Sequence, residues 1–198
     1  AVYARHVLKL RALEALDQVP GAAERGTVIH DVLDAYTREA SEGPVADPVG
    51  RLMALGREHF APFWDDPTVR AVWWPRFLRI AAWFVVADDE RRQGFVIAHA
   101  ERSGHLEFDT PAGRTFRLTT KADRIDVTSD GRAEILDYKT GNPPSDKQVN
   151  SGLAPQLPLE AAVLRTGGFP EIDADLAVSA LVYAKLGGRD PAGELRTV

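Results

Sequence analysis

The first half of the chain has the hydrophobic pattern of amphipathic helices. Apolar residues recur at three- and four-residue spacing, and turn-forming residues at Pro20-Gly21 and Ser41–Pro44 interrupt the pattern. Because a helix presents such residues on one face, these segments are expected to pack against a core. The expected helices cover residues 2–16, 24–40, 47–60 and 67–92.

After residue 94 the pattern changes to short β-rich runs. Gly104 and Gly113 mark expected turns between them. A further helix is expected near residues 155–166, with Pro155 at its first position. We therefore predict an α/β fold with a mixed central β-sheet flanked by helices. The expected strands cover residues 95–100, 106–108, 115–119, 122–128, 133–140 and 177–186.

These elements indicate one domain over residues 1–198, with a helical part at 1–93 and the sheet core at 94–198. The chain begins without Met, and its first residues resemble the middle of a helix, so we expect it to be a piece of a longer protein. Neither a basic leader nor a signal-peptide pattern opens it. No apolar run approaches the ~20 residues that cross a bilayer, so no membrane partner is expected.

The composition narrows the possible chemistry. Hydrophobic residues make up 44% and charged residues 27%, which is typical of a globular protein. The sequence contains no cysteine, which excludes disulfides, thiolate zinc sites, iron–sulfur clusters and cysteine nucleophiles. A reducing, cytoplasmic compartment is consistent with this composition.

The net charge of −5 argues against a broad basic surface for nucleic acid. A metal-dependent phosphodiesterase nevertheless needs carboxylates, and a domain of a larger protein can leave most DNA contacts to its neighbours. Basic residues do cluster locally, and we interpret each cluster as a solvated helix face. The clusters are Arg5, His6, Lys9 and Arg11; Arg70, Arg76 and Arg79; and Arg91 and Arg92.

The candidate chemistry lies in the strands at 122–128 and 133–140. Asp137 and Lys139 are two residues apart, so they share one face of their strand. The three-residue connection 129–131, with Gly131 in a left-handed conformation, sets the register of an antiparallel pair. That register places Asp123 directly across from Asp137, with ~4.5–5.5 Å between their Cβ atoms.

Two ionised carboxylates at that distance repel each other, and a divalent cation relieves the repulsion. Oxygen ligands of this kind suit Mg²⁺ or Mn²⁺. Lys139 would then stabilise charge that develops on a phosphoryl group. The alternative for an Asp-x-Lys pair is an ordinary salt bridge at a strand end.

Four ordered motifs resemble those of the PD-(D/E)XK nuclease superfamily, in its RecB-like branch. They are Gly26-Thr-Val-Ile-His30, Ala122-Asp-Arg-Ile-Asp126, Ile135-Leu-Asp-Tyr-Lys-Thr-Gly141 and Pro155-Gln-Leu-Pro-Leu-Glu160. The resemblance extends over about residues 3–168 and is strongest to the AddB family of nuclease domains, in its alphaproteobacterial form. It implies a restriction-endonuclease-like core with an added N-terminal helical region.

The resemblance also implies roles for individual residues. His30, Asp123 and Asp137 would bind the metal, with the backbone carbonyl of Tyr138 as a further ligand. Lys139 would be the catalytic lysine, and the catalytic set would comprise the two aspartates, this lysine and Gln156. From the residues alone, a histidine at the edge of the core is the alternative for His30.

Other residues near these motifs are expected to have structural, surface or undetermined roles. Many relatives carry an iron–sulfur cluster, which the absence of cysteine excludes here. Glu160 stands where the branch often has tyrosine, and its role stays open. Glu101 is expected at the surface, with assistance to the metal as the alternative. Asp126 is expected to face away from Asp123 and to pair with Arg124 or Arg132.

The resemblance implies a metal-dependent deoxyribonuclease of exonuclease type. It would act on a DNA single strand emerging from a helicase, beside an AddA-type helicase–nuclease subunit, in bacterial double-strand break repair and recombination near the nucleoid. Two alternatives remain: a catalytically silent nuclease-like domain that binds DNA or docks a subunit, and a metal phosphohydrolase for a small substrate. The latter predicts a closed pocket, whereas a nuclease needs an open groove.

Overall fold

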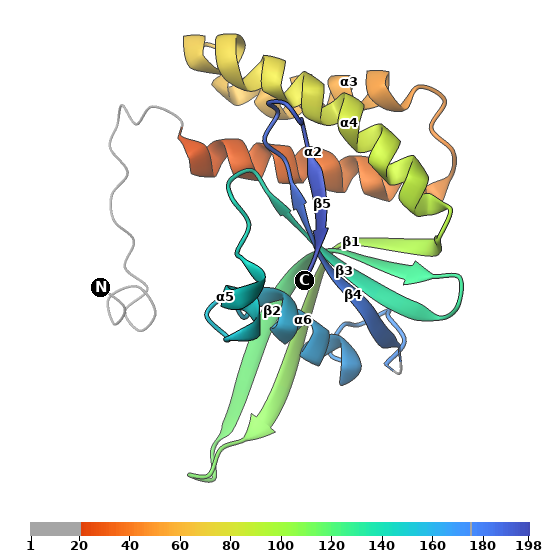
Figure 1. Cartoon of the computed structure of the whole chain (residues 1–198), viewed down its shortest axis with the longest axis vertical. Coiled ribbons are helices and arrows are strands. Elements are labelled where there is room, and N and C mark those ends of the chain that lie inside the picture. Colours follow the sequence, from red (N-terminus) through yellow and green to blue (C-terminus); the bar gives the residue numbers. More distant parts are fainter. Residues whose placement is uncertain (1–20, 175) are drawn as a thin grey trace.

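The structure, a computed structural model, describes residues 21–174 and 176–198. In these residues, a five-stranded sheet lies between two unequal helical layers (Figure 1). The predicted α/β architecture, a mixed sheet flanked by helices with an N-terminal helical region, is confirmed. The helix expected at residues 2–16 lies outside the described residues. Among the described helices, none has the length and apolar character needed to cross a bilayer.

Three long helices cover one face of the sheet. They are α2 (Ala22–Glu42), α3 (Pro48–Phe60) and α4 (Trp74–Arg92), close to the predicted segments. A short 3-10 helix, η1 (Ala61–Phe63), and a π-helical turn, η2 (Val69–Trp73), lie between α3 and α4. The buried apolar faces of the three helices form one core together with Tyr138, Ala184 and Leu186 of the sheet region.

The sheet has the order β1-β2-β3-β4-β5. Only β3 and β4 run parallel, and the other neighbours are antiparallel, so the sheet is mixed. The strands are β1 (Phe95–Asp109), β2 (Thr115–Thr128), β3 (Arg132–Lys139), β4 (Ala177–Lys185) and β5 (Glu194–Thr197).

The connection between the parallel strands β3 and β4 covers the other face of the sheet. A parallel pair requires such a crossover, which usually contains a helix. Here the crossover contains α5 (Asp146–Asn150) and α6 (Gln156–Arg165). A second core forms where Leu157, Val163 and Leu164 of α6 pack on Ile125 and Ile135 of the sheet.

Three details at the crossover and at the C-terminus differ from the sequence prediction. Pro155 precedes α6 and does not occupy its first helical position. The sequence prediction missed α5 and β5, which have five and four residues and are too short to show a periodic pattern.

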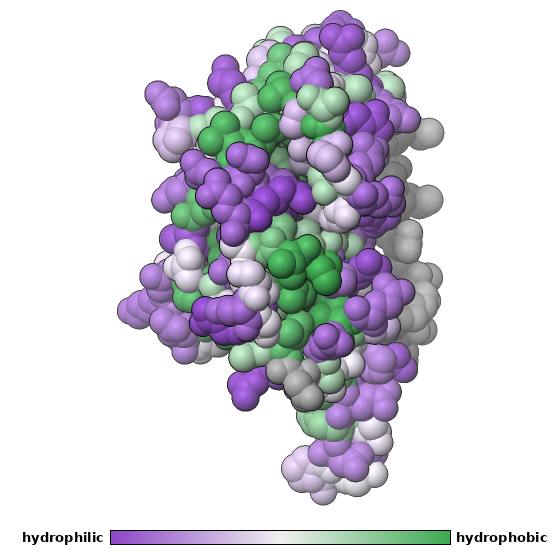
Figure 2. Space-filling view, turned by 90° about the vertical axis from the view of Figure 1, so that its right-hand side faces the viewer, coloured by the Kyte–Doolittle hydropathy of each residue, from purple (hydrophilic) through white to green (hydrophobic). Residues whose placement is uncertain are grey.

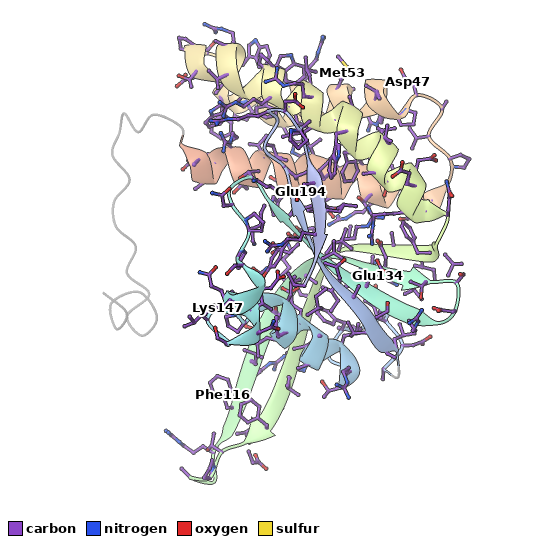
Figure 3. The ribbon with its side chains drawn as sticks, viewed as in Figure 1. Asp47, Met53, Phe116, Glu134, Lys147 and Glu194 are labelled. Carbon is purple, nitrogen blue, oxygen red and sulfur yellow. The ribbon has the colours of Figure 1, made fainter. Side chains whose placement is uncertain are left out.

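β1 and β2 form one long hairpin where the sequence predicted four shorter strands. The expected turn at Gly113 is present, but the expected turn at Gly104 is wrong, because Gly104 lies inside β1. A Cβ atom there would lie 2.6 Å from the Phe169 ring and 2.9 Å from the Gly168 carbonyl oxygen, so glycine permits close packing. The far part of the hairpin, with Phe116, extends beyond the rest of the fold (Figure 3).

A buried ion cluster joins α4 to β2. Arg124 is 1% exposed; its Nε donates to Asp126 Oδ1 at 2.6 Å and its Nη1 to Asp88 Oδ1 at 2.7 Å. The predicted pairing of Asp126 with Arg124 is therefore confirmed. Both carboxylates are also buried, and a buried charge is tolerated only where it is paired.

Two arginines that the sequence assigned to a solvated helix face belong to the same cluster. Arg91 donates to Asp126 Oδ2 at 2.7 Å and to Glu134 Oε2 at 2.9 Å. Arg92 donates to Asp88 Oδ2 at 2.7 Å. The expectation of solvated side chains was wrong here because the end of α4 packs against the sheet, where carboxylates need cationic partners.

The outer surface is mainly polar. Figure 2 shows the face on the right-hand side of Figure 1, where an apolar area at mid-height lies between more hydrophilic regions. Among exposed apolar side chains, Val96 and Ile97 of β1 are 66% and 49% exposed. β1 is an edge strand of the described sheet, so these side chains lie on one of its margins.

We predict that Gly104→Ala destabilises the fold by about 1–3 kcal/mol, the usual cost of an added methyl group in a filled space. The new Cβ would meet both a ring and a backbone carbonyl. Gly43→Ala is the matched control, because Gly43 has extended backbone and nothing lies within 4 Å of its Cβ position. Urea unfolding measures the free energy of unfolding of both variants. Equal stability of the two would contradict the packing argument.

Candidate metal centre

The candidate site begins where β2 and β3 separate. Their ladder has the predicted register, Ile125 opposite Ile135 and Arg124 opposite Leu136, and the connection has Gly131 at φ 77°. The next pair would be Asp123 and Asp137, but the ladder ends before it. The predicted register is therefore observed, but the regular ladder stops one residue pair before the two aspartates.

Each aspartate instead takes its own partners. Asp123 Oδ2 accepts a hydrogen bond from the backbone N–H of Tyr138 at 2.8 Å, so its side chain reaches into the gap between the strands. Asp137 Oδ1 accepts hydrogen bonds from Lys139 Nζ at 2.7 Å and from Gln156 Nε2 at 2.5 Å. Two adjacent carboxylates repel each other, and this division gives each one a separate set of donors.

Tyr138 reaches the site through its backbone. Its side chain is buried in the core under α2–α4, while its N–H donates to Asp123. The N–H and C=O groups of one strand residue point toward the same neighbouring strand, so the carbonyl oxygen also faces β2. Its role as a metal ligand stays a prediction.

His30 enters the site from α2. The buried residues Val28, Ile29, Val32 and Leu33 fix that helix against the core, and this places His30 Nδ1 3.4 Å from Asp123 Oδ2. Burial acts to lower the pKa of His30. The hydrogen bond and charge of Asp123, with the charge of Asp137, outweigh burial and raise the pKa above the ordinary 6.5.

Glu101 belongs to the site, and the sequence expectation of a surface residue was wrong. It lies in β1 between the pairs Ala100–Arg124 and Arg102–Ala122, which brings it level with Asp123. Its side chain is 13% exposed, and its φ of 53° is a left-handed conformation that a non-glycine residue rarely adopts. Such strain is concentrated at functional sites.

These three side chains form a group that could hold a cation. One ligand atom each from His30, Glu101 and Asp123 lie within 4.8 Å of one another. Asp137, predicted from the sequence as a ligand, is not in this group, because its carboxylate is turned to Lys139 and Gln156. Lys121 forms an ion pair with Glu101 at the outer side.

Lys139 and Gln156 stand together on the other side of Asp137. Lys139 Nζ donates to Gln156 Oε1 at 3.2 Å as well as to Asp137. Burial raises the pKa of Asp137, and the hydrogen bond and charge of Lys139 oppose that rise. Gln156 is at the first turn of α6, so the crossover helix positions it at the end of β3.

Glu160, whose role the sequence left open, lies one helical turn after Gln156 and is fully buried. Its Oε1 accepts hydrogen bonds from Gln156 Nε2 and Thr120 Oγ1, both at 3.3 Å. Its Oε2 has no hydrogen-bond partner among the described residues. Burial, followed by the charges of Asp137 and Asp123, raises its pKa to about 7.

The arrangement therefore has two parts. His30, Glu101 and Asp123 could supply nitrogen and oxygen ligands for a cation. Asp137, Lys139 and Gln156 supply a charged and hydrogen-bonded set beside it. Among the residues of these two groups, Glu101 was expected at the surface, with assistance to the metal only as the alternative, because its position depends on the register of the unbroken β1–β2 hairpin.

Two proteins of Rickettsia are similar to this chain, and both are described as uncharacterized. The one from Rickettsia bellii (strain RML369-C) is 29% identical over 167 residues, and the one from Rickettsia conorii (strain ATCC VR-613 / Malish 7) is 28% identical over 171 residues. Each match covers 84% of this chain and 20% of the relative. The chain thus spans about a fifth of the length of these curated relatives.

A solved structure, described as the crystal structure of SSO0001, matches 88% of this chain and 78% of its own, at 14% identity and a TM-score of 0.36. That likeness is too low to carry an argument. A family model described as the PD-(D/E)XK nuclease superfamily matches residues 2–197. Because this match covers almost the whole sequence, the chain belongs to the PD-(D/E)XK nuclease superfamily.

Proposed function

We propose that the chain is a divalent-metal-dependent nuclease domain that hydrolyses DNA phosphodiester bonds. The observation that carries the proposal is the meeting of His30, Glu101 and Asp123 within 4.8 Å, next to Asp137 and Lys139. Nucleases of this superfamily use divalent metals. An intact lysine beside the acidic residues argues against a catalytically silent domain.

The donor set fits a small, hard cation. Two carboxylates and a backbone carbonyl favour Mg²⁺ or Mn²⁺, and imidazole is compatible with the latter. Glu160 lies near the same region, because the charges of Asp137 and Asp123 contribute to its raised pKa. When bound, the cation would lower the pKa of a water molecule and neutralise charge on a phosphoryl oxygen.

The protein's own residues would orient the substrate and stabilise charge. Lys139 Nζ already shares its protons between Asp137 and Gln156, so it can turn one N–H toward a phosphoryl oxygen and keep another on Asp137. Gln156 bonds to both members of that pair and holds them in one geometry. Donors fixed before the reaction stabilise developing charge without reorganisation.

The finer assignment is also a proposal. The motifs around Asp123 and Asp137 resemble those of AddB-type domains, which supports an exonuclease in an AddAB- or RecBCD-like helicase–nuclease complex. Its substrate would be the single strand that the helicase releases, its partner an AddA-type subunit, and its role bacterial double-strand break repair and recombination near the nucleoid. The match covers only 20% of the Rickettsia bellii relative, which is consistent with one domain of a larger machine.

We predict that Asp137→Asn and Lys139→Ala each reduce cleavage of labelled single-stranded DNA in Mg²⁺ or Mn²⁺ by at least about 100-fold, as expected for lost charge stabilisation. Asp89→Asn is the matched control, since Asp89 is exposed on α4. If wild type and Asp137→Asn cut equally, at a negligible rate, the silent-domain alternative is favoured over the nuclease.

We predict that Mn²⁺ affinity, measured by calorimetry, falls as the pH drops through the pKa of His30, which lies above 6.5. The ion and a proton compete for the imidazole, which gives about a tenfold loss per pH unit below that pKa. Glu101→Gln should weaken Mn²⁺ binding by at least about 10-fold. Glu107→Gln, on the exposed part of β1, should not, and similar losses in the two variants would remove Glu101 from the site.

We predict that, without metal, the free energy of unfolding falls by about 3 kcal/mol as the pH rises from 4.5 to about 7 because of Glu160. Its folded pKa is raised, so its stabilising contribution is fully present below 4.5 and is lost as the carboxyl ionises. Glu160→Gln should remove this part of the pH dependence in urea unfolding. The exposed control Glu58→Gln should retain it, and a wild-type profile in Glu160→Gln would refute the assignment.

A further inference from the structure

A hollow with several charged residues in its lining adjoins the candidate metal centre. Its volume is about 400 Å³, and it lies where β3 and β4 end beneath the start of α2. Thr140, which follows Lys139, contributes to its wall, so the hollow begins where β3 ends. The side chains that give it its character are Arg25, Arg76, Thr140, Asn142, Lys185 and Arg189.

The four cations of this hollow outnumber the two acids that line it, one of which, Glu194, lies opposite Lys185 in the β4–β5 ladder. Asp190 and Glu194 also line it, and Glu194 begins β5 below the helices (Figure 3). Yet among residues 21–174 and 176–198, neither acid forms an ion pair with any of the four cations. Arg91, Arg92 and Arg124, by contrast, each have carboxylate partners.

The cations repel one another in their present positions. Burial, and after it the charges of Arg76 and Arg189, lower the pKa of Arg25. Like charges that outnumber the nearby counter-charges cost free energy, and a bound anion reduces that cost. A fold that holds such a group together is therefore suited to an anionic ligand.

The hollow is held in shape by packing. The loop that carries Arg189 lies on α4, where Arg79 Nε donates to the Gly188 carbonyl oxygen at 2.7 Å. A Cβ at Gly188 would lie 2.7 Å from both the Cβ and the carbonyl oxygen of Arg76, so the loop and the helix are in close contact. Gly188 N–H donates to the Ala192 carbonyl at 2.8 Å, which closes the loop on itself.

The hollow and the metal centre are within reach of one strand. Arg25 and His30 lie on the same helix, and their separation of five positions corresponds to about 7.5 Å along its axis. Phosphates advance about 3.4 Å per nucleotide along the axis of duplex DNA, and an extended single strand spaces them further apart. A strand that crosses the metal centre would therefore meet the hollow one or two nucleotides away.

We propose that this hollow binds a phosphate group of the DNA strand, one or two nucleotides from the bond that is cut. Three guanidinium groups favour phosphate, because their planar N–H pairs match its oxygens. Lys185, Thr140 and Asn142 add further donors. The inference rests on the proposed nuclease function and assigns the phosphate either to an internal diester or to a strand end.

The test measures binding separately from cleavage. Short fluorescent single strands, with a 5′-hydroxyl or a 5′-phosphate, are titrated with the chain in EDTA over a series of KCl concentrations. Arg76→Gln and Arg189→Gln should each weaken binding about 3- to 10-fold, and the double variant should lower the salt slope by about 0.7 for each charge removed. The control Arg165→Gln, exposed at the end of α6, should bind as wild type.

The outcomes distinguish a terminal from an internal phosphate, and they distinguish failure of the phosphate site from failure of the proposed nuclease function. Tighter binding of the 5′-phosphorylated strand that disappears in the double variant assigns a terminal phosphate, and equal binding of both strands with loss in the variant assigns an internal one. A double variant that binds both strands like wild type, with an unchanged salt slope, overturns the inference. Arg189 is exposed, so Arg189→Gln gives a reading even if Arg76→Gln fails to fold. If the double variant loses binding but wild type does not cleave DNA in Mg²⁺, the phosphate site is retained and the proposed nuclease function is rejected.

Discussion

The buried ion cluster around Arg124 is the constraint on which the candidate metal centre depends. Arg124 follows Asp123 directly and is bound by Asp88 of α4 and by Asp126 of its own strand. A slip of β2 by one residue would leave these charges buried and unpaired, at a cost of several kcal/mol. The cluster thereby fixes β2 against the helical layer at the residue where the strand separates from β3, and so determines where Asp123 can reach.

The separation of β2 from β3 explains how Asp123 and Asp137 can lie in one site while each has its own hydrogen-bond donors. Asp123 accepts the N–H of Tyr138, a group that would otherwise bond to the backbone of β2. Asp137 remains on β3 and is neutralised by Lys139. The break in the ladder therefore creates the space of the site, and each side of it has its own chemistry. α2 and α6 close it from opposite layers with His30 and Gln156.

Much of this arrangement could be predicted from the sequence, because it depends on local signals. The odd-length connection ending in Gly131 determined the β2–β3 register, helical periodicity located α2, and Pro155 indicated the start of α6. Glu101 could not be predicted this way. Its place depends on an unbroken β1, whereas Gly104 suggested a turn. Only the three-dimensional contact with Phe169 shows why glycine is needed there. The ion partners of Arg91 and the end of the ladder likewise depend on tertiary packing.

The left-handed conformation of Glu101 affects more than the position of its carboxylate. β1 lies at a margin of the described sheet, and its start exposes Val96 and Ile97. A straight, apolar margin strand is a template on which a foreign chain can add itself, and local backbone irregularities prevent such growth. At φ 53° the row of amide groups along β1 is interrupted in its middle. The same distortion that places the Glu101 carboxylate among the candidate ligands would therefore also disfavour the addition of a foreign strand along this margin.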